Sequence, residues 1–303
     1  MKKRNVLIAC MCILAAALIT LAVALPKSHA AIGRDARKRY EEYEERLSKE
    51  QGDLDENDKT SGDSLVFWFP VPEGYLDKES DDRKYVSKTN AYDTPEEWAA
   101  LEDVIAMREA SQVPSDVIDT VSTDELVLYC MNYNLFVDLF LFKTMQEGID
   151  SIRINYNGLS ELINREDAAE CLIRLYKLYD LEAQAARDER STIRLHYLES
   201  MLCMPEILDS LTADQSKELA AACADKINRI VNDENCIYSA GTAMYLAAIS
   251  QYETSEEFAS IIDASSGAKR YVEEGILVPD EISDSTIGEI VSYFAEILKQ
   301  RAK

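Results

Sequence analysis

Histidine and the common catalytic motifs are scarce in this chain of 303 residues. Only one of its two histidines, His196, lies after residue 30, which excludes a zinc site built from several histidines of one chain. The sequence also lacks the patterns G-x-S-x-G, G-x-x-x-x-G-K-[ST], G-x-G-x-x-G and H-E-x-x-H. We therefore expect neither a metal nor a cofactor, and the sequence favours a non-enzymatic protein over an enzyme.

The seven cysteines show no pairing or metal-binding pattern, and no C-x-x-C occurs. Cys10 and Cys12 lie in an apolar run near the N-terminus, and the other five are an odd number that cannot pair completely within the chain. Most of these five lie among apolar residues of helical stretches, where we expect free, buried thiols: Cys130, Cys171, Cys203, Cys223 and Cys236. This usage fits a reducing compartment or an export route that does not depend on disulfides.

Basic side chains are outnumbered: 32 Lys and Arg stand against 56 Asp and Glu, for a net charge of −24. Residues 1–30 contain four basic residues and no acid, which leaves 28 basic and 56 acidic residues for the rest. Such a body is repelled by nucleic-acid phosphates and by anionic lipid headgroups. We expect no nucleic-acid partner and, if the charge serves more than solubility, a basic protein partner or divalent cations.

Residues 6–25 form an uncharged apolar run. As a helix, twenty residues span about 30 Å, the thickness of a membrane's hydrocarbon core. We therefore expect residues 1–30 to be an N-terminal signal anchor. The alternative is a signal peptide, because Pro26 and the small residues that follow it would allow cleavage near Ala30.

The orientation of this segment rests on the basic residues that flank it. Residues 2–4 are all basic, and the other flank carries five basic residues: Lys27, Arg34, Arg37, Lys38 and Arg39. Because the flank with more basic residues tends to stay in the cytoplasm, this count favours a cytoplasmic body. A short basic N-terminus directly ahead of the apolar run instead favours export, so we expect an anchored body outside the cytoplasm, with secretion or a cytoplasmic body as alternatives.

Three regions follow from these patterns. After residues 1–30, residues 31–63 are expected to form a juxtamembrane helix and an acidic linker, and residues 64–303 a helical domain. This domain begins with residues 64–75, where aromatic residues and two prolines predict an extended segment across the helices. The alternative is that Phe67, Trp68 and Phe69 form an exposed contact for a partner or ligand.

Helix follows helix from residue 94 onward. Capping signals at residues 94–97, 122–125, 212–215 and 254–257 mark helix starts. The starts are irregularly spaced, so no repeat period is indicated. The sequence predicts an all-α fold, either an irregular helical bundle or a short array of helical hairpins.

Three finer expectations concern the middle of the chain. Residues 135–146 are apolar nearly all round, which predicts a central helix, buried on most sides and ended by Gly148. Asn157 and Gly158 indicate a turn. Residues 159–186 should be the longest helical stretch, with a candidate break near Asn164.

One resemblance lies in residues 113–179, roughly a fifth of the chain. Its features are Pro114, Ser122, Thr123, Leu126 and Tyr133, followed by Tyr156, Asn157, Gly158, Leu159, Glu161, Leu162, Arg165, Asp167 and Ala168. The run resembles a segment of exported or membrane-anchored helical proteins of gut bacteria that have no assigned function. The resemblance implies location and fold class, and it transfers no functional residue.

Two groups of residues are candidates for chemistry. His196, Glu199 and Cys203 share a helix face and could supply base, orienting acid and nucleophile. Residues along one helix seldom converge on a substrate, so a partly buried histidine paired with an acid is the ordinary interpretation. Ser266 and Lys269 match S-x-x-K, but the accompanying S-D-N and K-T-G elements are missing.

Arg165 is the remaining candidate, in a polar cluster with Glu166 and Asp167 between apolar helices. It is expected to fix a helix junction through a carboxylate or, alternatively, to contact a ligand. Taken together, the sequence favours a non-enzymatic interaction or scaffold module at the cell surface. The alternatives are an exported enzyme acting on envelope polymers or glycans, a small-ligand receptor, and a cytoplasm-facing anchored regulator.

Overall fold

The computed structural model describes residues 69–76, 98, 100–101, 103–142, 144–188, 190–232, 236, 238, 240–274 and 281–301. Within these residues all regular secondary structure is helical and no strand occurs, which confirms the predicted all-α class. The predicted membrane segment, juxtamembrane helix and linker lie outside the described residues, as does the helix start at residue 94. Among the helices that the structure describes, none combines the length and the apolar character needed to cross a bilayer.

The described ranges contain fourteen α-helices and one 3₁₀ helix. The first half of the domain contains α4 (Val104–Ala110), α5 (Ser115–Ile118), α6 (Thr123–Met131), η2 (Phe136–Leu141), α7 (Met145–Asn155), α8 (Asn157–Leu162), α9 (Ala168–Leu178) and α10 (Leu181–Ala185). The second half contains α11 (Ser191–Leu202), α12 (Pro205–Asp209), α13 (Ala213–Asn232), α14 (Gly241–Thr254), α15 (Glu256–Asp263), α16 (Ser266–Glu274) and α17 (Asp284–Arg301).

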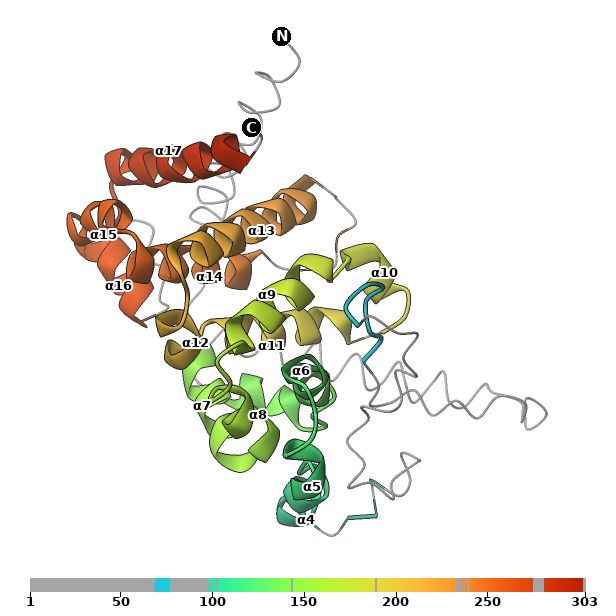
Figure 1. The fold of residues 1–303 in the computed structure, drawn as a ribbon. Coiled ribbons are helices and arrows are strands. Elements are labelled where there is room, and N and C mark those ends of the chain that lie inside the picture. The colour runs from blue at the N-terminus through green and yellow to red at the C-terminus, as the bar shows by residue number, and fades with distance from the viewer. Residues whose placement is uncertain are drawn as a thin grey trace, which may run out of the picture.

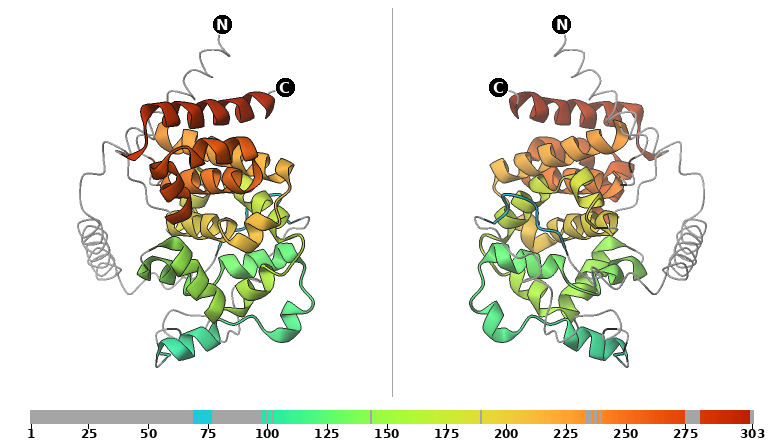
Figure 2. Two further views of the ribbon diagram at one scale, coloured as in Figure 1. Left: turned by 90° about the vertical axis from the view of Figure 1, so that its left-hand side faces the viewer. Right: turned by 90° about the vertical axis from the view of Figure 1, so that its right-hand side faces the viewer.

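The helices succeed one another through the molecule roughly in chain order, as Figures 1 and 2 show. The green helices α4–α8 lie at one end, α9 and α11 lie in the middle, and the red helix α17 is the outermost element at the other end. α13 and α14 pack closely against each other, and α17 packs against α13 and α15. Consecutive helices therefore bury their apolar faces mainly against near neighbours in the sequence.

Several helices begin where the sequence predicts. Ser122 caps α6, with the Glu125 side chain accepting a hydrogen bond from the Ser122 backbone N–H. Thr212 and Gln215 form the same reciprocal pair at α13. α15 starts one residue later than its signal suggested, because the side chain of Ser255 makes the capping hydrogen bond.

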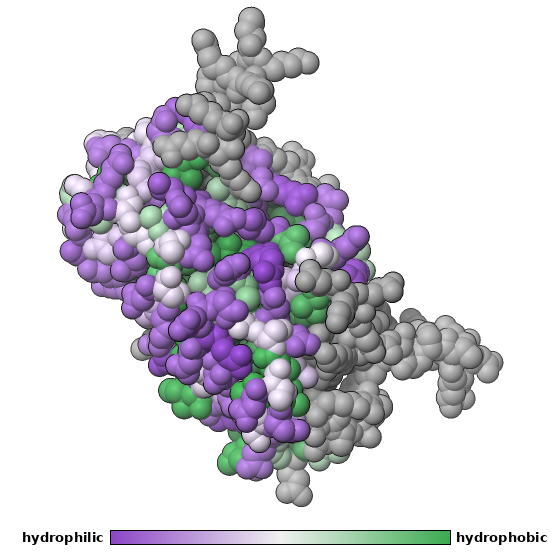
Figure 3. Space-filling view, in the orientation of Figure 1, coloured by the Kyte–Doolittle hydropathy of each residue, from purple (hydrophilic) through white to green (hydrophobic). Residues whose placement is uncertain are grey.

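The expectation for residues 135–146 is wrong. Only a short 3₁₀ helix, η2, forms there, and α7 starts at Met145 because Thr144 and Glu147 make a capping box. Phe136 and Leu139 are buried, but Phe140, Leu141 and Phe142 are 49%, 77% and 43% exposed. In Figure 3 the largely hydrophilic face carries separate hydrophobic patches, one of them at the end where α7 lies. Residues 140–142 are thus apolar but exposed, and this run does not form a central helix.

Gly148 does not end a helix either; it lies inside α7 against the backbone of η2. A Cβ atom at Gly148 would lie 2.3 Å from the carbonyl oxygen of Leu139, whereas at Gly288 in α17 it would meet nothing within 4 Å. We expect Gly148→Ala to lower the free energy of unfolding by about 2 kcal/mol, because backbone must move. Gly288→Ala should raise it by about 0.5–1 kcal/mol, because alanine is the better helix former. Urea unfolding of both variants measures these opposite signs, and equal effects would contradict the packing described.

The predicted turn at Asn157 is also wrong, since α8 starts there. The Asn157 side chain accepts a hydrogen bond from the Val113 N–H at 2.9 Å and donates to the Val113 carbonyl at 2.7 Å. This long-range pairing replaces the local turn that asparagine followed by glycine indicates. Residues 159–186 are divided among α8, α9 and α10, so the longest described helix is α13 and not this stretch.

Residues 69–72 have no regular secondary structure and lie against the helical body, in agreement with the predicted extended segment, but a turn follows at residues 73–76. Phe69, Val71 and Tyr75 are buried, and the Phe69 N–H donates to the Asn132 side chain at 2.7 Å. The Gln184 side chain donates to the carbonyl of Pro70 at 3.0 Å. The five cysteines after residue 30 are free and four are buried, which confirms that expectation.

Candidate functional site

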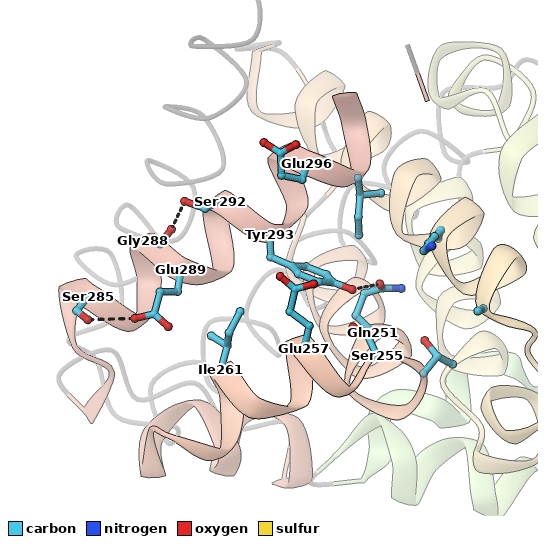
Figure 4. A pocket seen from close by; sticks show the side chains of 14 residues that line it. Gln251, Ser255, Glu257, Ile261, Ser285, Gly288, Glu289, Ser292, Tyr293 and Glu296 are labelled. Carbon is cyan, nitrogen blue, oxygen red and sulfur yellow. Dashed lines mark hydrogen bonds between the residues drawn. The ribbon is translucent and has the colours of Figure 1, made fainter. Parts of the chain in front are cut away.

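A cleft of about 800 Å³ opens beneath α17 and is lined by side chains from α13, α14, α15 and α17. Figure 4 shows Tyr293 reaching from α17 to Gln251 on α14, with Glu257 and Ile261 on α15 across from α17. The contribution of α17 comes from residues three or four apart, which share one helix face: Ser285, Gly288, Glu289, Ser292, Tyr293, Glu296 and Ile297.

The amphipathic character of α17 explains why this face is left open. Val291, Phe294 and Ile297 are buried and form the apolar stripe that places the helix on the body. The neighbouring face carries glycine, serine and glutamate, which are too small or too polar to close the gap to α15. The sequence therefore attaches α17 along one edge and leaves a polar cleft along the other.

Hydrogen bonds join the side chains at the floor of the cleft. The Tyr293 hydroxyl donates to Gln251 Oε1 at 2.7 Å, and Gln251 Nε2 donates to the Ser216 hydroxyl. The Tyr293 ring packs on Phe258, with ring centroids 4.8 Å apart. Burial raises the pKa of Tyr293, and Glu257 adds to the shift, so the hydroxyl keeps its proton. The hydrogen bond and the ring contact hold Tyr293 in place, and its raised pKa means that its hydroxyl is not poised to exchange a proton near neutral pH.

The walls of the cleft are acidic. Glu257 on α15 and Glu289 on α17 are exposed, and neither has an ion pair with another described residue. Glu296 pairs with Lys299 of its own helix, and Lys217 is the basic residue among those that line the cleft. Three carboxylates against one ammonium make the cleft attractive to cations.

The chemical candidate on α11 is a buried polar network. Glu199 is fully buried; its Oε1 accepts a hydrogen bond from the Tyr176 hydroxyl at 3.0 Å, and its Oε2 lies 3.4 Å from His196 Nδ1. His196 Nδ1 also lies 2.8 Å from the Thr242 hydroxyl oxygen. Burial raises the pKa of Cys203, and Glu199 raises it further, so this thiol is a poor nucleophile. The structure thus supports the ordinary interpretation, a histidine paired with an acid.

Lys226 on α13 is a buried charge next to this network. Its Nζ donates to the Tyr179 carbonyl at 2.7 Å and lies 4.7 Å from the centre of the Tyr176 ring. Burial lowers the pKa of Lys226 to about 8, although Glu199 and Cys223 oppose the shift. Sequence analysis did not find this lysine, because the alanine-rich surroundings of α13 give no sign that a charge is buried.

The lowered pKa of Lys226 makes stability depend on pH. Between pH 8 and the ordinary lysine pKa the unfolded chain binds more protons, so this group makes stability rise with pH. We expect a gain of about 2 kcal/mol from pH 8 to pH 9.5 that Lys226→Met abolishes. Urea unfolding of both proteins across that range tests it; parallel profiles would contradict a shifted lysine.

The other predicted residues lie apart from the cleft. Arg165 pairs with Glu161 at 2.7 Å and donates to the carbonyls of Ile118 and Val121, so it fixes a helix junction. Phe69 is buried and therefore anchors the extended segment, whereas Phe67 and Trp68 lie outside the described residues.

The structure does not support a serine nucleophile activated by a lysine at Ser266 and Lys269. Lys269 pairs with Asp263 at 3.0 Å, and this hydrogen bond raises the lysine pKa, so the amine is not poised as a base. In the part of the chain that the structure describes, no three His, Cys, Asp or Glu side chains are grouped to hold a metal ion.

Comparison with known proteins adds no relative: no family model, curated protein or solved structure matches the chain. The resemblance of residues 113–179 therefore stays a prediction.

Proposed function

We propose that this chain is a non-enzymatic interaction module, an irregular helical bundle that binds a basic segment of a partner protein in the cleft beneath α17. One observation carries the proposal: Glu257 and Glu289 face the same cleft from α15 and α17, and neither has an ion pair with another described residue. Both carboxylates would attract a cation that enters the cleft. The net charge of −24 adds a long-range attraction for basic partners.

The rest of the lining suits arginine or lysine side chains. Ile261 and Ile297 offer apolar surface to the alkyl stem of such a side chain, while the glutamates receive its charged end. Arginine can bind a carboxylate with two parallel hydrogen bonds, so it should bind more tightly than lysine. The pKa of Tyr293 is raised, so its hydroxyl is a poor acid or base near neutral pH. This favours a binding role for the cleft over acid–base catalysis.

We further propose that residues 6–25 hold the chain at a membrane with the body outside the cytoplasm. The uncharged run supports this location, and so does the resemblance to exported or anchored proteins of gut bacteria. Secretion after cleavage near Ala30, or a cytoplasmic body, are the alternatives. A reporter fused after Lys303 that is active only outside the cytoplasm separates these orientations.

Blocking the cleft tests the proposed binding. The probe is a labelled decapeptide of alternating arginine and alanine, with a glutamate–alanine decapeptide as its counterpart. Gly288→Trp should place an indole ring in the cleft, because a Cβ atom at Gly288 meets nothing within 4 Å. We expect the arginine peptide to bind the full chain and Gly288→Trp to weaken this binding about tenfold, or about 1.4 kcal/mol. Gly288→Ala is the matched control and should bind as the unmodified chain does.

Two results of this experiment would overturn the proposal. One is equal binding to the Gly288→Trp and Gly288→Ala chains, which would place the peptide elsewhere. The other is equal binding of the arginine and glutamate peptides, which would remove the role of charge.

A further inference from the structure

Glu199 on α11 is a buried carboxylate with only one of its two oxygens hydrogen-bonded. Its side chain is 0% exposed, and its Oε1 accepts a hydrogen bond from the Tyr176 hydroxyl at 3.0 Å. Among the residues that the structure describes, none donates a hydrogen bond to Oε2. A buried acceptor without a donor costs free energy, and the cost is larger when the acceptor is charged. One bound proton would remove this cost.

His196 lies where it can share such a proton with Glu199. Its Nδ1 is 3.4 Å from Glu199 Oε2 and 2.8 Å from the Thr242 hydroxyl oxygen. A neutral imidazole nitrogen offers either one N–H or one lone pair, and the shorter contact gives this single site to Thr242. An extra proton on Oε2 would let the carboxyl group donate to Nδ1, with the Thr242 hydroxyl donating to Met145 Sδ at 3.8 Å. An extra proton on the ring would instead set an imidazolium charge against the carboxylate, so in both cases the proton belongs to the pair.

The neighbouring groups leave this pair as the place where a proton exchanges below pH 7. α14, η2 and α7 contribute a hydroxyl, a phenyl ring and a thioether around His196, and none of these titrates there: Thr242, Phe140 and Met145. The titratable side chains that face Glu199 are Tyr176 on α9, His196 and Cys203 on α11, and Cys223 and Lys226 on α13. Burial raises the pKa of Tyr176, Cys203 and Cys223, so these three keep their protons. Lys226, with its pKa lowered to about 8, stays charged below pH 7.

The sign of the effect follows from the burial of Glu199. Burial raises the pKa of its carboxyl group, although His196, Tyr176 and Lys226 oppose the shift. As the pH falls, the folded chain therefore binds this proton before the unfolded chain does. A proton that the folded chain binds preferentially makes the folded chain more stable as the pH falls, and this contribution is lost as the pH rises through the pKa of the folded chain.

We propose that Glu199 and His196 form a proton-binding site, a pH-sensitive device that holds α11 against α9 and α14 more firmly in mildly acid than in neutral solution. Tyr176 connects the pair to α9, and Thr242 connects it to α14. α9 and α11 lie in the middle of the molecule (Figure 1), so the site acts on its central junction. None of these residues lines the cleft beneath α17, so this proposal and the proposed binding can fail separately.

Urea unfolding of the full chain between pH 7.5 and pH 5.5 tests the site with Glu199→Gln. Glutamine has the shape of a protonated carboxyl group and can donate to Nδ1, but it binds no proton. As the pH falls, the folding equilibrium constant of the unmodified chain should rise relative to that of the variant, by at most about tenfold per pH unit, the limit for one proton. The control is Glu170→Gln, which removes an exposed carboxylate from α9 and should leave the corresponding ratio nearly constant.

Tyr176→Phe provides a second measurement, which decides the matter if Glu199→Gln does not fold. It keeps the ring and removes the hydroxyl that stabilises the carboxylate through Oε1. The proton should then bind more tightly, and the change in stability should move to higher pH. Parallel profiles of the unmodified and Glu199→Gln chains would overturn the proposal. So would a Tyr176→Phe profile that stays in place or moves to lower pH.

Discussion

Asp188→Asn should lower the free energy of unfolding by about 3–5 kcal/mol, because it leaves a buried guanidinium without its counter-charge. The side chain of Arg194 is 1% exposed, and its Nε lies 2.5 Å from Asp188 Oδ2. Burial lowers the pKa of Arg194, and Asp188 opposes the shift, as expected for a charge held away from water. Asparagine keeps an oxygen that can accept the hydrogen bond from the Arg190 N–H, so the change removes mainly the charge.

The position of Arg194 explains why the effect should be large. Its guanidinium lies 4.7 Å from the centre of the Phe136 ring and 5.7 Å from that of Phe69. It also donates to the carbonyl of Met131. One side chain thus joins α11, η2, the end of α6 and the extended segment, and losing its partner should loosen all four.

The matched control for this prediction is Asp263→Asn. Asp263 pairs with Lys269 at 3.0 Å, and both side chains are more than 40% exposed. Water and salt screen exposed ion pairs, so this change should have little effect on the free energy of unfolding. Urea unfolding of the two variants measures the difference. Equal losses would contradict the account of a buried ion pair that holds the extended segment to the helices.

The second large effect concerns binding. Glu257→Lys combined with Glu289→Lys should weaken binding of the arginine–alanine decapeptide at least about 100-fold, since like charges placed together cost several kcal/mol. Glu166→Lys combined with Glu170→Lys changes the net charge equally, on exposed residues around the start of α9. That control should weaken binding only slightly at 0.15 M salt, where distant exposed charges are screened. Fluorescence anisotropy measures the affinity of both variants for the peptide. Equal losses would mean that the peptide responds to the net charge of the protein and not to the cleft.

Local signals predict those parts of the fold whose causes are local. Ser122 and Glu125 cap α6 as expected, because a capping box needs only four consecutive residues. Asn157 failed as a turn signal because its amide pairs with the backbone of Val113, more than forty residues away. The apolar run at residues 135–146 failed because the capping box at Thr144 starts a new helix inside it.

The candidate cleft could not be read from the sequence for a similar reason. Its glutamates stand on α15 and α17, and its floor joins Tyr293 to Gln251 of α14 and Ser216 of α13. Each helix alone is an ordinary amphipathic helix, and only their packing brings the carboxylates to one opening. By contrast His196 and Glu199, on one helix, were paired correctly from their spacing.

Amide hydrogen exchange with and without the arginine–alanine decapeptide tests the central claim most directly. The account predicts that saturating peptide slows exchange in α17 and in residues 254–261, the two sides of the cleft, and leaves α4–α8 unchanged. Protection confined to α4–α8, or no protection in α17 at saturation, would contradict it.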